Sequence, residues 1–374
     1  MAPLKKVILS VTNDLTTEQR VDKVCRTLIK MGFNPILTGR RKRDSQDLPE
    51  RAYRTRRFRL LFEKGPLFYA SYNTRLFFYL LSSKTDLIVA NDLDTLMASY
   101  LASKIKGVPL VYDTHEYYTE TPELVNRPGV QAVWRGIEKR VFPRLKHVYT
   151  VNESIARIYE KAYGVEVQVV RNVPETKALL PERNRRLKGL PEDKKIILLQ
   201  GAGINIHRGA EEMVRAMQYI ENAVFMVVGG GDVLDNLKRL TSELGLENKV
   251  IFIPKQPLDK VLEYTVEADL GVTLDKDTNP NYRYSLPNKL FDYIQAGVPV
   301  LASPLAEVKK IIEEYDIGTT IDSHDPRHIA DKVNEIFSDP KKLGLWKQNL
   351  KFASEALCWE KEEQTLIQIY RPFV

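Results

Sequence analysis

A cation and a carboxylate lie three residues apart near an expected helix start, in the segment Ser285–Val300 (SLPNKLFDYIQAGVPV). Pro287 suits a first helical turn, and Gly297 ends the helix about ten residues later, so Lys289 and Asp292 should project from one side. The unpaired N–H groups and the dipole of a helix N-terminus attract anions. Together with Lys289 they would suit a phosphate, while Asp292 could accept hydrogen bonds from sugar hydroxyls. The pattern predicts a nucleotide-sugar site, and a surface ion pair on a capped helix is the alternative.

Two glycine-containing turns follow expected strands in the same half of the chain. Gly203 precedes Arg208 in the first turn, and Gly230 lies in the second turn, Val227–Asp232. Glycines let a backbone approach a phosphate closely, although they more often serve only tight turning. Arg208 is a second candidate phosphate ligand. With Lys289 and a helix N-terminus, it could balance the negative charge of a leaving diphosphate without a metal ion.

The turn after the first expected strand, Ser10–Arg20, contains no glycine. A dinucleotide-binding domain needs small residues there, so a dehydrogenase is disfavoured. Asn13, Asp14 and Arg20 could line a cleft and contact an acceptor. They could equally form a helix cap and a surface salt bridge.

Polar residues also follow two later strands of the first half. Asp92 and Asp94 spell D-x-D at an expected helix start, where acidic residues favour the helix dipole, and we expect no metal there. His115 and Glu116 are candidates for contacting a transferred sugar, whereas Asp113 is expected to be structural. A loop histidine that only forms hydrogen bonds is the alternative for His115.

Short apolar runs alternate with amphipathic segments in both halves, which is typical of parallel sheets covered by helices. Strands are expected at 5–11, 34–38, 86–90, 109–112 and 147–151, and then at 195–200, 223–228, 249–253, 269–273 and 299–302. Two such sheets would face each other across a cleft lined by the C-terminal ends of their strands, where ligands of open α/β sheets bind.

The length of 374 residues predicts two domains, with a polar, proline-containing linker between Asn172 and Lys194. We place an N-terminal Rossmann-like domain at 1–178 and a C-terminal Rossmann-like domain at 190–357. The amphipathic segment Trp359–Tyr370 could belong to either domain.

Charge is uneven along the chain, whose formal net charge is +7. Much of the positive excess lies in 40–43 and 51–59, which precede the Phe/Tyr-rich segment 67–81. These segments could rest on an anionic membrane surface, or they could be a solvated loop leading into a core helix. No nucleic-acid recognition module is present in the sequence. The only cysteines, Cys25 and Cys358, lack metal or redox spacing, and with no signal peptide expected they favour a cytoplasmic protein.

These features together resemble the retaining glycosyltransferases of the GT-B fold, most nearly the GT4-like family that builds bacterial polysaccharides and glycolipids. The segments that carry the resemblance are Tyr112–Glu116, Arg208-Gly209, Val228–Gly231, Ala268–Gly271 and Ser285–Val300. It implies that the C-terminal domain binds a nucleotide diphosphate sugar, the N-terminal domain binds the acceptor, and a final helix at 358–374 crosses back to the N-terminal domain.

The resemblance also implies residue roles. His115 would lie by the anomeric carbon of the donor sugar, and Arg208 and Lys289 would hold the diphosphate. The remaining donor-binding residues would be Ser285 and Leu286 through their backbone, Asp292 at the ribose, Lys255 beside the base, Gly203 and Gly230 at the glycine turns, and Glu307. Asn13, Arg20, Asp92 and Glu116 are the acceptor-side candidates.

Two departures from the family pattern fall in the expected donor site, and a weaker or differently oriented site is one alternative. Tyr284 and Asp292 stand where the family often has two glutamates, and Gly201-Ala202 replaces a usual Gly-Arg. The site has one cation fewer, and a catalytically silent member is an alternative.

The sequence therefore predicts a metal-independent enzyme without a cofactor that moves a hexose-type sugar from a UDP- or GDP-sugar to a glycan or lipid-linked acceptor. Retention of configuration is implied by the resemblance alone. The enzyme would be cytoplasmic, with possible contact at the inner face of an anionic membrane, and would not bind nucleic acid. A nucleotide-sugar epimerase of the same fold and a non-catalytic module that binds sugar nucleotides or membrane surfaces are the rival functions.

Overall fold

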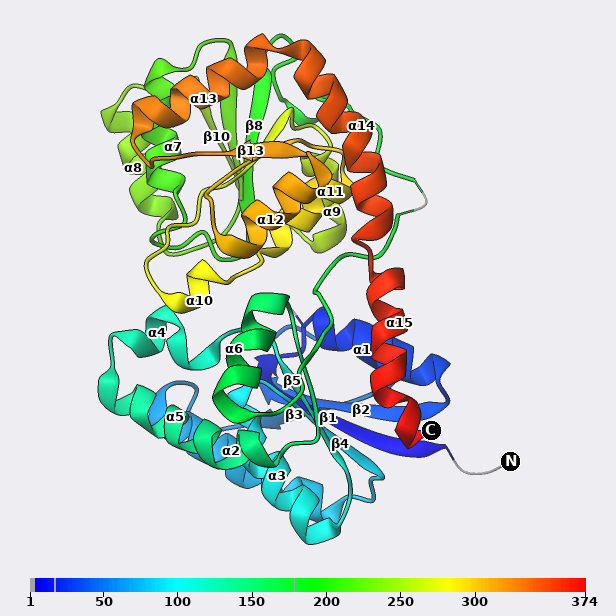
Figure 1. Cartoon of the computed structure of the whole chain (residues 1–374). Coiled ribbons are helices and arrows are strands. Elements are labelled where there is room, and N and C mark those ends of the chain that lie inside the picture. Colours follow the sequence, from blue (N-terminus) through cyan, green and yellow to red (C-terminus); the bar gives the residue numbers. More distant parts are fainter. Residues whose placement is uncertain (1–3, 17, 178) are drawn as a thin grey trace. The chain divides into compact units, whose positions relative to one another are not determined.

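The computed structural model describes residues 4–16, 18–177 and 179–374. The chain divides into two compact units (Figure 1). Unit 1 comprises residues 1–172 and 362–374, and unit 2 comprises residues 173–361.

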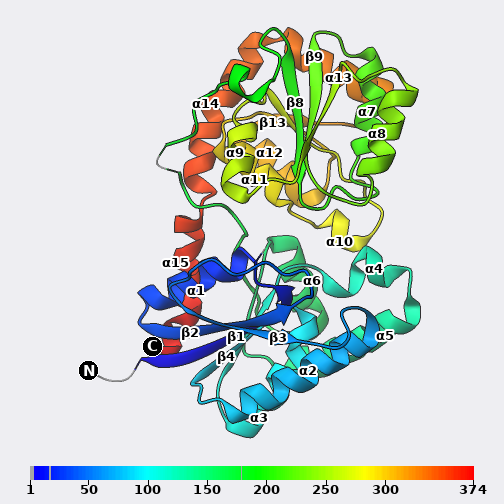
Figure 2. The same ribbon diagram turned by 180° about the vertical axis from the view of Figure 1, so that it is seen from behind.

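Unit 1 is built on a parallel sheet with the strand order β3-β2-β1-β4-β5-β6-β7. The strands are β1 (Lys5–Asp14), β2 (Phe33–Arg41), β3 (Arg54–Arg59), β4 (Leu87–Asn91), β5 (Leu110–Thr114), β6 (His147–Thr150) and β7 (Gln168–Val169). The helices are α1 (Arg20–Lys30), α2 (Gly65–Ser82), α3 (Leu93–Lys106), α4 (Pro122–Val125), α5 (Pro128–Val141) and α6 (Glu153–Tyr163). Helices α2, α3 and α5 cover the face of the sheet opposite to α1 (Figures 1 and 2).

Unit 2 contains a second parallel sheet with the order β10-β9-β8-β11-β12-β13. Its strands are β8 (Lys195–Gly201), β9 (Ala223–Gly229), β10 (Val250–Pro254), β11 (Leu270–Thr273), β12 (Val300–Ala302) and β13 (Gly318–Thr320). Its helices are α7 (Ala210–Ala216), α8 (Leu234–Glu243), α9 (Leu258–Thr265), α10 (Pro280–Arg283), α11 (Asn288–Gln295), α12 (Ala306–Tyr315), α13 (Pro326–Ser338) and α14 (Pro340–Ala356).

Central strands are buried on both faces, which explains their continuous apolar sequences. Successive side chains of β8 enter two different cores: Ile197 and Leu199 pack with helices α7, α8 and α13, and Ile196 and Leu198 pack with α11, α12 and α14. The predicted fold class, two doubly wound parallel sheets covered by helices, is confirmed.

The last helix, α15 (Trp359–Tyr370), begins in unit 2 and contributes its later residues to unit 1. Its Glu363 pairs with Lys30 of α1 at 2.8 Å between Oε1 and Nζ, and the hydroxyls of Tyr370 and Tyr149 lie 3.3 Å apart. The chain therefore returns to the first sheet at its end.

Each expected strand is present, but in the described part of the chain the sequence prediction misses three strands, β3, β7 and β13. Strand β3 falls within Arg51–Arg59, for which a solvated loop was one of the two expectations, so the loop expectation is wrong for this part of the chain. Only Phe58 of its six residues is buried, because β3 lies at the sheet edge and pairs through its backbone with β2 alone. The short edge strands β7 and β13 carry no apolar run long enough to be recognised.

The strand order reverses once in each sheet, between β1 and β4 in unit 1 and between β8 and β11 in unit 2. In open α/β sheets, the strand ends at such a reversal point are where ligands bind. Asp92 directly follows β4, and Asp275 lies two residues after β11. Both candidate groups of side chains therefore start from these two positions.

Candidate functional site

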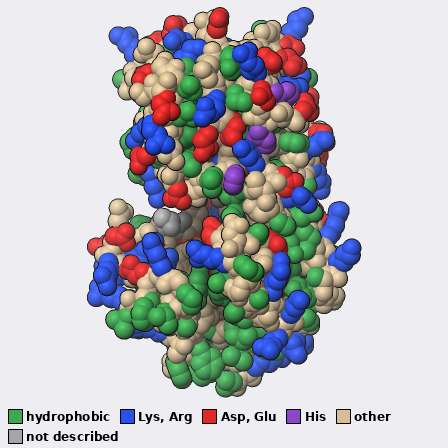
Figure 3. All heavy atoms as spheres, turned by 90° about the vertical axis from the view of Figure 1, so that its left-hand side faces the viewer, with side chains coloured by type: hydrophobic (Ala, Val, Ile, Leu, Met, Phe, Trp, Pro, Cys, Tyr) green, Lys and Arg blue, Asp and Glu red, His purple; other side chains and the backbone are tan. Residues whose placement is uncertain are grey.

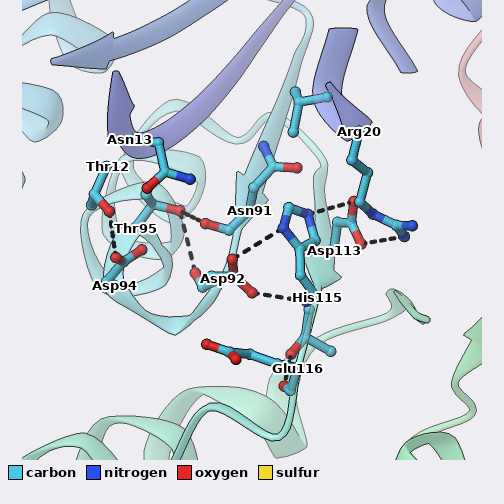
Figure 4. A network of polar contacts seen from close by, with 12 residues as sticks. Thr12, Asn13, Arg20, Asn91, Asp92, Asp94, Thr95, Asp113, His115 and Glu116 are labelled. Carbon is cyan, nitrogen blue, oxygen red and sulfur yellow. Dashed lines mark hydrogen bonds and ion pairs between the residues drawn. The ribbon is translucent and has the colours of Figure 1, made fainter. Parts of the chain in front are cut away.

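In unit 1, His115 lies between two carboxylates at the C-terminal ends of neighbouring strands (Figure 4). Its Nδ1 is 3.1 Å from Asp92 Oδ2, and its Nε2 is 3.0 Å from Asp113 Oδ2. Asp113 is buried and also accepts two hydrogen bonds from Arg20, at 3.0 Å from Nε and 2.9 Å from Nη2. Arg20, Asp92, Asp113 and His115 thus form one connected network.

The charges in this network fix its protonation. Burial alone would lower the pKa of His115, but Asp92 and Asp113 raise it well above its usual value. Burial acts to raise the pKa of Asp113, and Arg20 and His115 overcome that effect and hold it at about 2. At neutral pH, the imidazolium and the guanidinium therefore face two carboxylates.

The backbone at Asp92 is held in an unusual conformation. Its φ is 60°, in the left-handed region that residues other than glycine rarely adopt. Asp92 donates its N–H to the carbonyl of Asp113 and accepts the N–H of His115 at 2.8 Å on its own Oδ1. Strained residues of this kind are frequent at functional sites, so Asp92 joins His115 as a candidate on structural grounds as well.

Asp94, the second carboxylate of the D-x-D sequence, points elsewhere. It is buried on α3 and accepts a hydrogen bond from Thr12 at 2.5 Å. Burial and the nearby Asp92 raise the pKa of Asp94 to about 7. Among the described residues, no group of three His, Cys, Asp or Glu side chains is arranged to hold a metal ion.

The acceptor-side residues predicted from the sequence do not all lie in contact with one another. Arg20 is buried and bonds to Asp113 and to the carbonyl of Val170, so its salt bridge is buried rather than at the surface. Asn13 is exposed and bonds to Glu18 at 3.2 Å, and Figure 4 shows it apart from Arg20. Glu116 follows His115, and its carbonyl accepts a hydrogen bond from Thr114.

In unit 2, the two predicted phosphate-binding cations contact the same buried carboxylate. Asp275 Oδ2 is 2.9 Å from Nη1 of Arg208, and its Oδ1 is 3.5 Å from Nζ of Lys289. Arg208 also lies over the ring of Tyr282, at 4.4 Å from the centroid. Burial lowers the pKa of Lys289, and Asp275 opposes this effect. The structure therefore brings Arg208 and Lys289 together.

The loop that carries Arg208 is tied to the loop after β11. His207 and Gly209, on either side of Arg208, both have left-handed backbones, with φ of 67° and 74°. The carbonyl of His207 accepts the N–H of Lys276 at 2.9 Å, and a side chain at Gly209 would collide with Leu274. These contacts fix the direction in which Arg208 projects.

Helix α11 is present where the sequence predicts it, with Pro287 as its N-cap residue and Gly297 shortly after its end. Asp292 accepts a hydrogen bond from Gln200 of β8 at 3.0 Å. Tyr293, on the same helix, donates its hydroxyl to the carbonyl of Leu198 at 3.0 Å. Lys289 and Asp292 therefore both face the strand ends of the sheet.

The glycine turns pack against each other. A side chain at Gly229 would collide with the Gly201 carbonyl, and the Gly230 N–H donates to that same carbonyl at 3.1 Å. A Cβ at Gly230 would lie 3.9 Å from Lys255 Cβ, so these two predicted residues are neighbours. Gly203 is exposed beside them in the β8–α7 loop.

The other predicted donor-side residues occupy nearby elements. Ser285 donates its hydroxyl to the carbonyl of Tyr282 at 2.9 Å, just before α11, and Leu286 packs partly against the core. Glu307 is buried in the first turn of α12. What these residues bind stays a prediction.

Asp275 is the main residue that the sequence prediction missed. It follows the strand expected at 269–273, and the reasoning that selected Asp92 after an earlier strand would have selected it as well. Asp113 was expected to be structural. In the structure, it links Arg20 to His115.

Family models match both halves of the chain. The model described as Glycosyltransferase Family 4 matches residues 17–176, and the model described as Glycosyl transferases group 1 matches residues 182–351. Together, these two matches leave only the ends of the chain and a short segment between the halves uncovered.

Curated relatives include D-inositol 3-phosphate glycosyltransferases. The one from Acidothermus cellulolyticus is 24% identical over 292 residues, covering 72% of this chain and 63% of the relative. The one from Xylanimonas cellulosilytica is 21% identical over 296 residues, covering 73% of this chain and 68% of the relative. This chain thus aligns with about two thirds of the length of each.

Solved structures share the fold over the whole chain. Sucrose-phosphate synthase from Thermosynechococcus elongatus has a TM-score of 0.80 at 18% identity, with 98% of both chains covered. Anabaena HepE in complex with UDP and glucose has a TM-score of 0.75 at 16% identity, with 99% of this chain and 100% of that chain covered. At these identities, the likeness is one of fold.

Proposed function

Because the chain belongs to the GT4-type glycosyltransferases of the GT-B fold, we propose that it transfers a sugar from a nucleotide diphosphate donor, a UDP- or GDP-sugar, to a glycan or lipid-linked acceptor. Complexes of HepE with UDP and with UDP-glucose support this class of donor. The proposal includes retention of configuration and catalysis without a metal ion.

The observation that carries the proposal is the pairing of Arg208 and Lys289 on Asp275. Two cations within 3.5 Å of one buried carboxylate are held where a second anion can be shared between them. The N-terminus of α11, which carries Lys289, adds a partial positive charge. Such a site stabilises the charge that develops on a departing diphosphate.

The remaining roles follow from the same proposal. Asp292, which is held by a hydrogen bond from Gln200, accepts hydrogen bonds from the ribose hydroxyls. Lys255 and Gly230, which are neighbours, flank the base. In unit 1, the imidazolium of His115, whose two N–H groups already face Asp92 and Asp113, lies by the transferred sugar and adds positive charge there. A raised pKa keeps the ring protonated at neutral pH.

Calorimetric titration with UDP and GDP tests the donor site. Arg208→Ala and Lys289→Ala should each weaken binding of the preferred nucleotide by about 1.5 to 3 kcal/mol, the range for charge-assisted hydrogen bonds, or roughly 10- to 150-fold. Arg239→Ala, which removes an exposed arginine of α8, is the matched control and should bind as the parent does. Unchanged binding in both test variants would refute the assignment.

Incubation with a panel of nucleotide sugars tests the reaction class. Slow release of free nucleotide, accelerated by an acceptor, supports a transferase; an isomerised donor indicates an epimerase; binding without turnover indicates a non-catalytic module. Inositol phosphate belongs in the acceptor panel because the curated relatives are named for it. Comparing the anomeric configuration of donor and product by NMR then tests retention, and activity in the presence of a chelator tests metal independence.

A further inference from the structure

Helix α2 is apolar on both faces. Phe68, Tyr72, Leu76 and Leu80 are buried in unit 1, yet Leu67 and Phe78 on the opposite side are exposed, Phe78 by 63%. Arg75 is the only charged residue among its 18 residues. A helix that is apolar all round is normally covered on both sides, so the outer face of α2 indicates a contact outside the unit.

The neighbouring helices continue this surface. Helix α3 packs against both α2 and α5, and all three lie on one face of the sheet (Figures 1 and 2). Ile105 of α3 is 66% exposed and Val133 of α5 is 62% exposed, with Leu101 and Val130 exposed nearby on the same helices. In the lower part of Figure 3, hydrophobic side chains gather beside lysines and arginines.

Charge on these helices is one-sided. Their only two carboxylates are buried, Asp94 with 7% exposed and Glu138 with 3% exposed. Their cations instead reach the surface: Arg75, Lys104, Arg135, Lys139 and Arg140 are exposed. Arg135 alone of these pairs with a carboxylate in unit 1, Glu120, among the contacts of the described residues. The exposed charges of these three helices are thus all cationic, and they lie among exposed apolar side chains.

We infer that the outer face of α2, α3 and α5 docks on an anionic lipid bilayer. Exposed apolar side chains among lysines and arginines match the interfacial region, where apolar groups enter the acyl boundary and cations meet the headgroups. The arginines of edge strand β3, of which Arg54, Arg56 and Arg59 are exposed, extend the positive charge beside α2. Among the described residues, no helix is long and apolar enough to cross a bilayer, so the unit would lie on the membrane surface.

A protein partner fits this surface less well. Protein interfaces concentrate apolar residues at a centre from which charges are depleted, whereas here cations are interspersed with single apolar side chains along three helices. The inference goes beyond the proposed function and does not depend on it, because it uses no residue of the donor site.

Flotation of the full-length protein with lipid vesicles tests the inference without any nucleotide. The parent should bind phosphatidylcholine vesicles that contain phosphatidylglycerol, bind pure phosphatidylcholine at least tenfold more weakly, and lose most binding in high salt. Phe78→Ser combined with Ile105→Ser should lower the partition coefficient at least tenfold, and so should Lys104→Glu combined with Lys139→Glu. Phe352→Ser, which removes a 70% exposed phenylalanine on α14 of unit 2, should leave it unchanged.

Three results would overturn the inference. The parent does not bind vesicles, it binds neutral and anionic vesicles equally, or both double variants bind as well as the parent does. Light scattering decides whether a second copy covers this face instead: a parent dimer that becomes monomeric in the Phe78/Ile105 variant would overturn it too. Nucleotide binding by that variant should equal that of the parent, which keeps this outcome separate from the donor-site test.

Discussion

Asp113→Asn tests the physical basis of the His115 network. Asp113 is buried and bonds to Arg20 through both carboxylate oxygens, so the amide would leave the guanidinium charge without its partner. Removing one member of a buried ion pair costs about 3 to 5 kcal/mol. The depressed pKa of Asp113 indicates a stabilisation of similar size: a value of about 2, against an ordinary value of 3.8, corresponds to about 2.5 kcal/mol of stability.

The pH dependence of the stability follows from the same shift in the pKa of Asp113. The folded state depresses the Asp113 pKa, so the contribution is fully present above about pH 4 and is lost as pH falls through about 2. Urea unfolding at neutral pH should therefore show a loss of about 2.5 to 5 kcal/mol in the variant, with hydrogen exchange reporting the change at the β5 amides. Asp47→Asn, at an exposed ion pair with Arg41, is the matched control and should change stability by less than about 1 kcal/mol.

Two results would contradict this reasoning. The first is an Asp113→Asn protein within about 1 kcal/mol of the parent. The second concerns the double variant Arg20→Met/Asp113→Leu, which removes both charges and should recover most of the lost stability. If the double variant were as unstable as Asp113→Asn, the unpaired guanidinium of Arg20 would not be the cause of that loss. In the single variant, NMR titration should also give a lower His115 pKa, because only Asp92 remains beside the ring.

Three further changes test the two sites. Asp275→Asn removes the carboxylate that both cations of the proposed donor site contact, so the pKa of Lys289, already lowered by burial, should fall further. Calorimetry should then show a nucleotide affinity that declines toward alkaline pH, and equal affinity at neutral and alkaline pH would refute this. His115→Ala should spare nucleotide binding and reduce turnover by about 100-fold or more, and turnover equal to that of the parent would make this histidine structural. Gly271→Ala would place a Cβ 2.5 Å from a buried tyrosine ring of α11, so thermal unfolding should show a loss of about 1 to 3 kcal/mol in stability. Gly344→Ala, at a helical position with open space, should leave stability unchanged or raise it, and equal effects of the two changes would contradict the packing argument.

The sequence predicts the two sheets because buried parallel strands leave long apolar runs, such as Val7–Leu9 and Ile196–Leu199. It does not reveal β3, because an edge strand is held by its backbone and Arg54–Arg59 carries a single buried side chain. In the proposed donor site, the sequence predicts Arg208 and Lys289, since cations near glycine and proline turns are visible in a sequence. Their shared contact with Asp275 depends on the spatial order of the strands, which places the end of β11 beside β8 although some 70 residues separate them.

The two sites share one physical arrangement. In each unit, a buried aspartate near the C-terminal ends of the strands holds two cationic side chains, Arg20 and His115 on Asp113, and Arg208 and Lys289 on Asp275. A buried carboxylate with two cations leaves a local excess of positive charge, which is costly unless an anion or a polar ligand completes it. In unit 1, Asp92 already completes the set around His115. In unit 2, Asp275 is the only carboxylate that the described contacts give to Arg208 and Lys289, so the excess of positive charge remains there, where the proposed diphosphate would balance it.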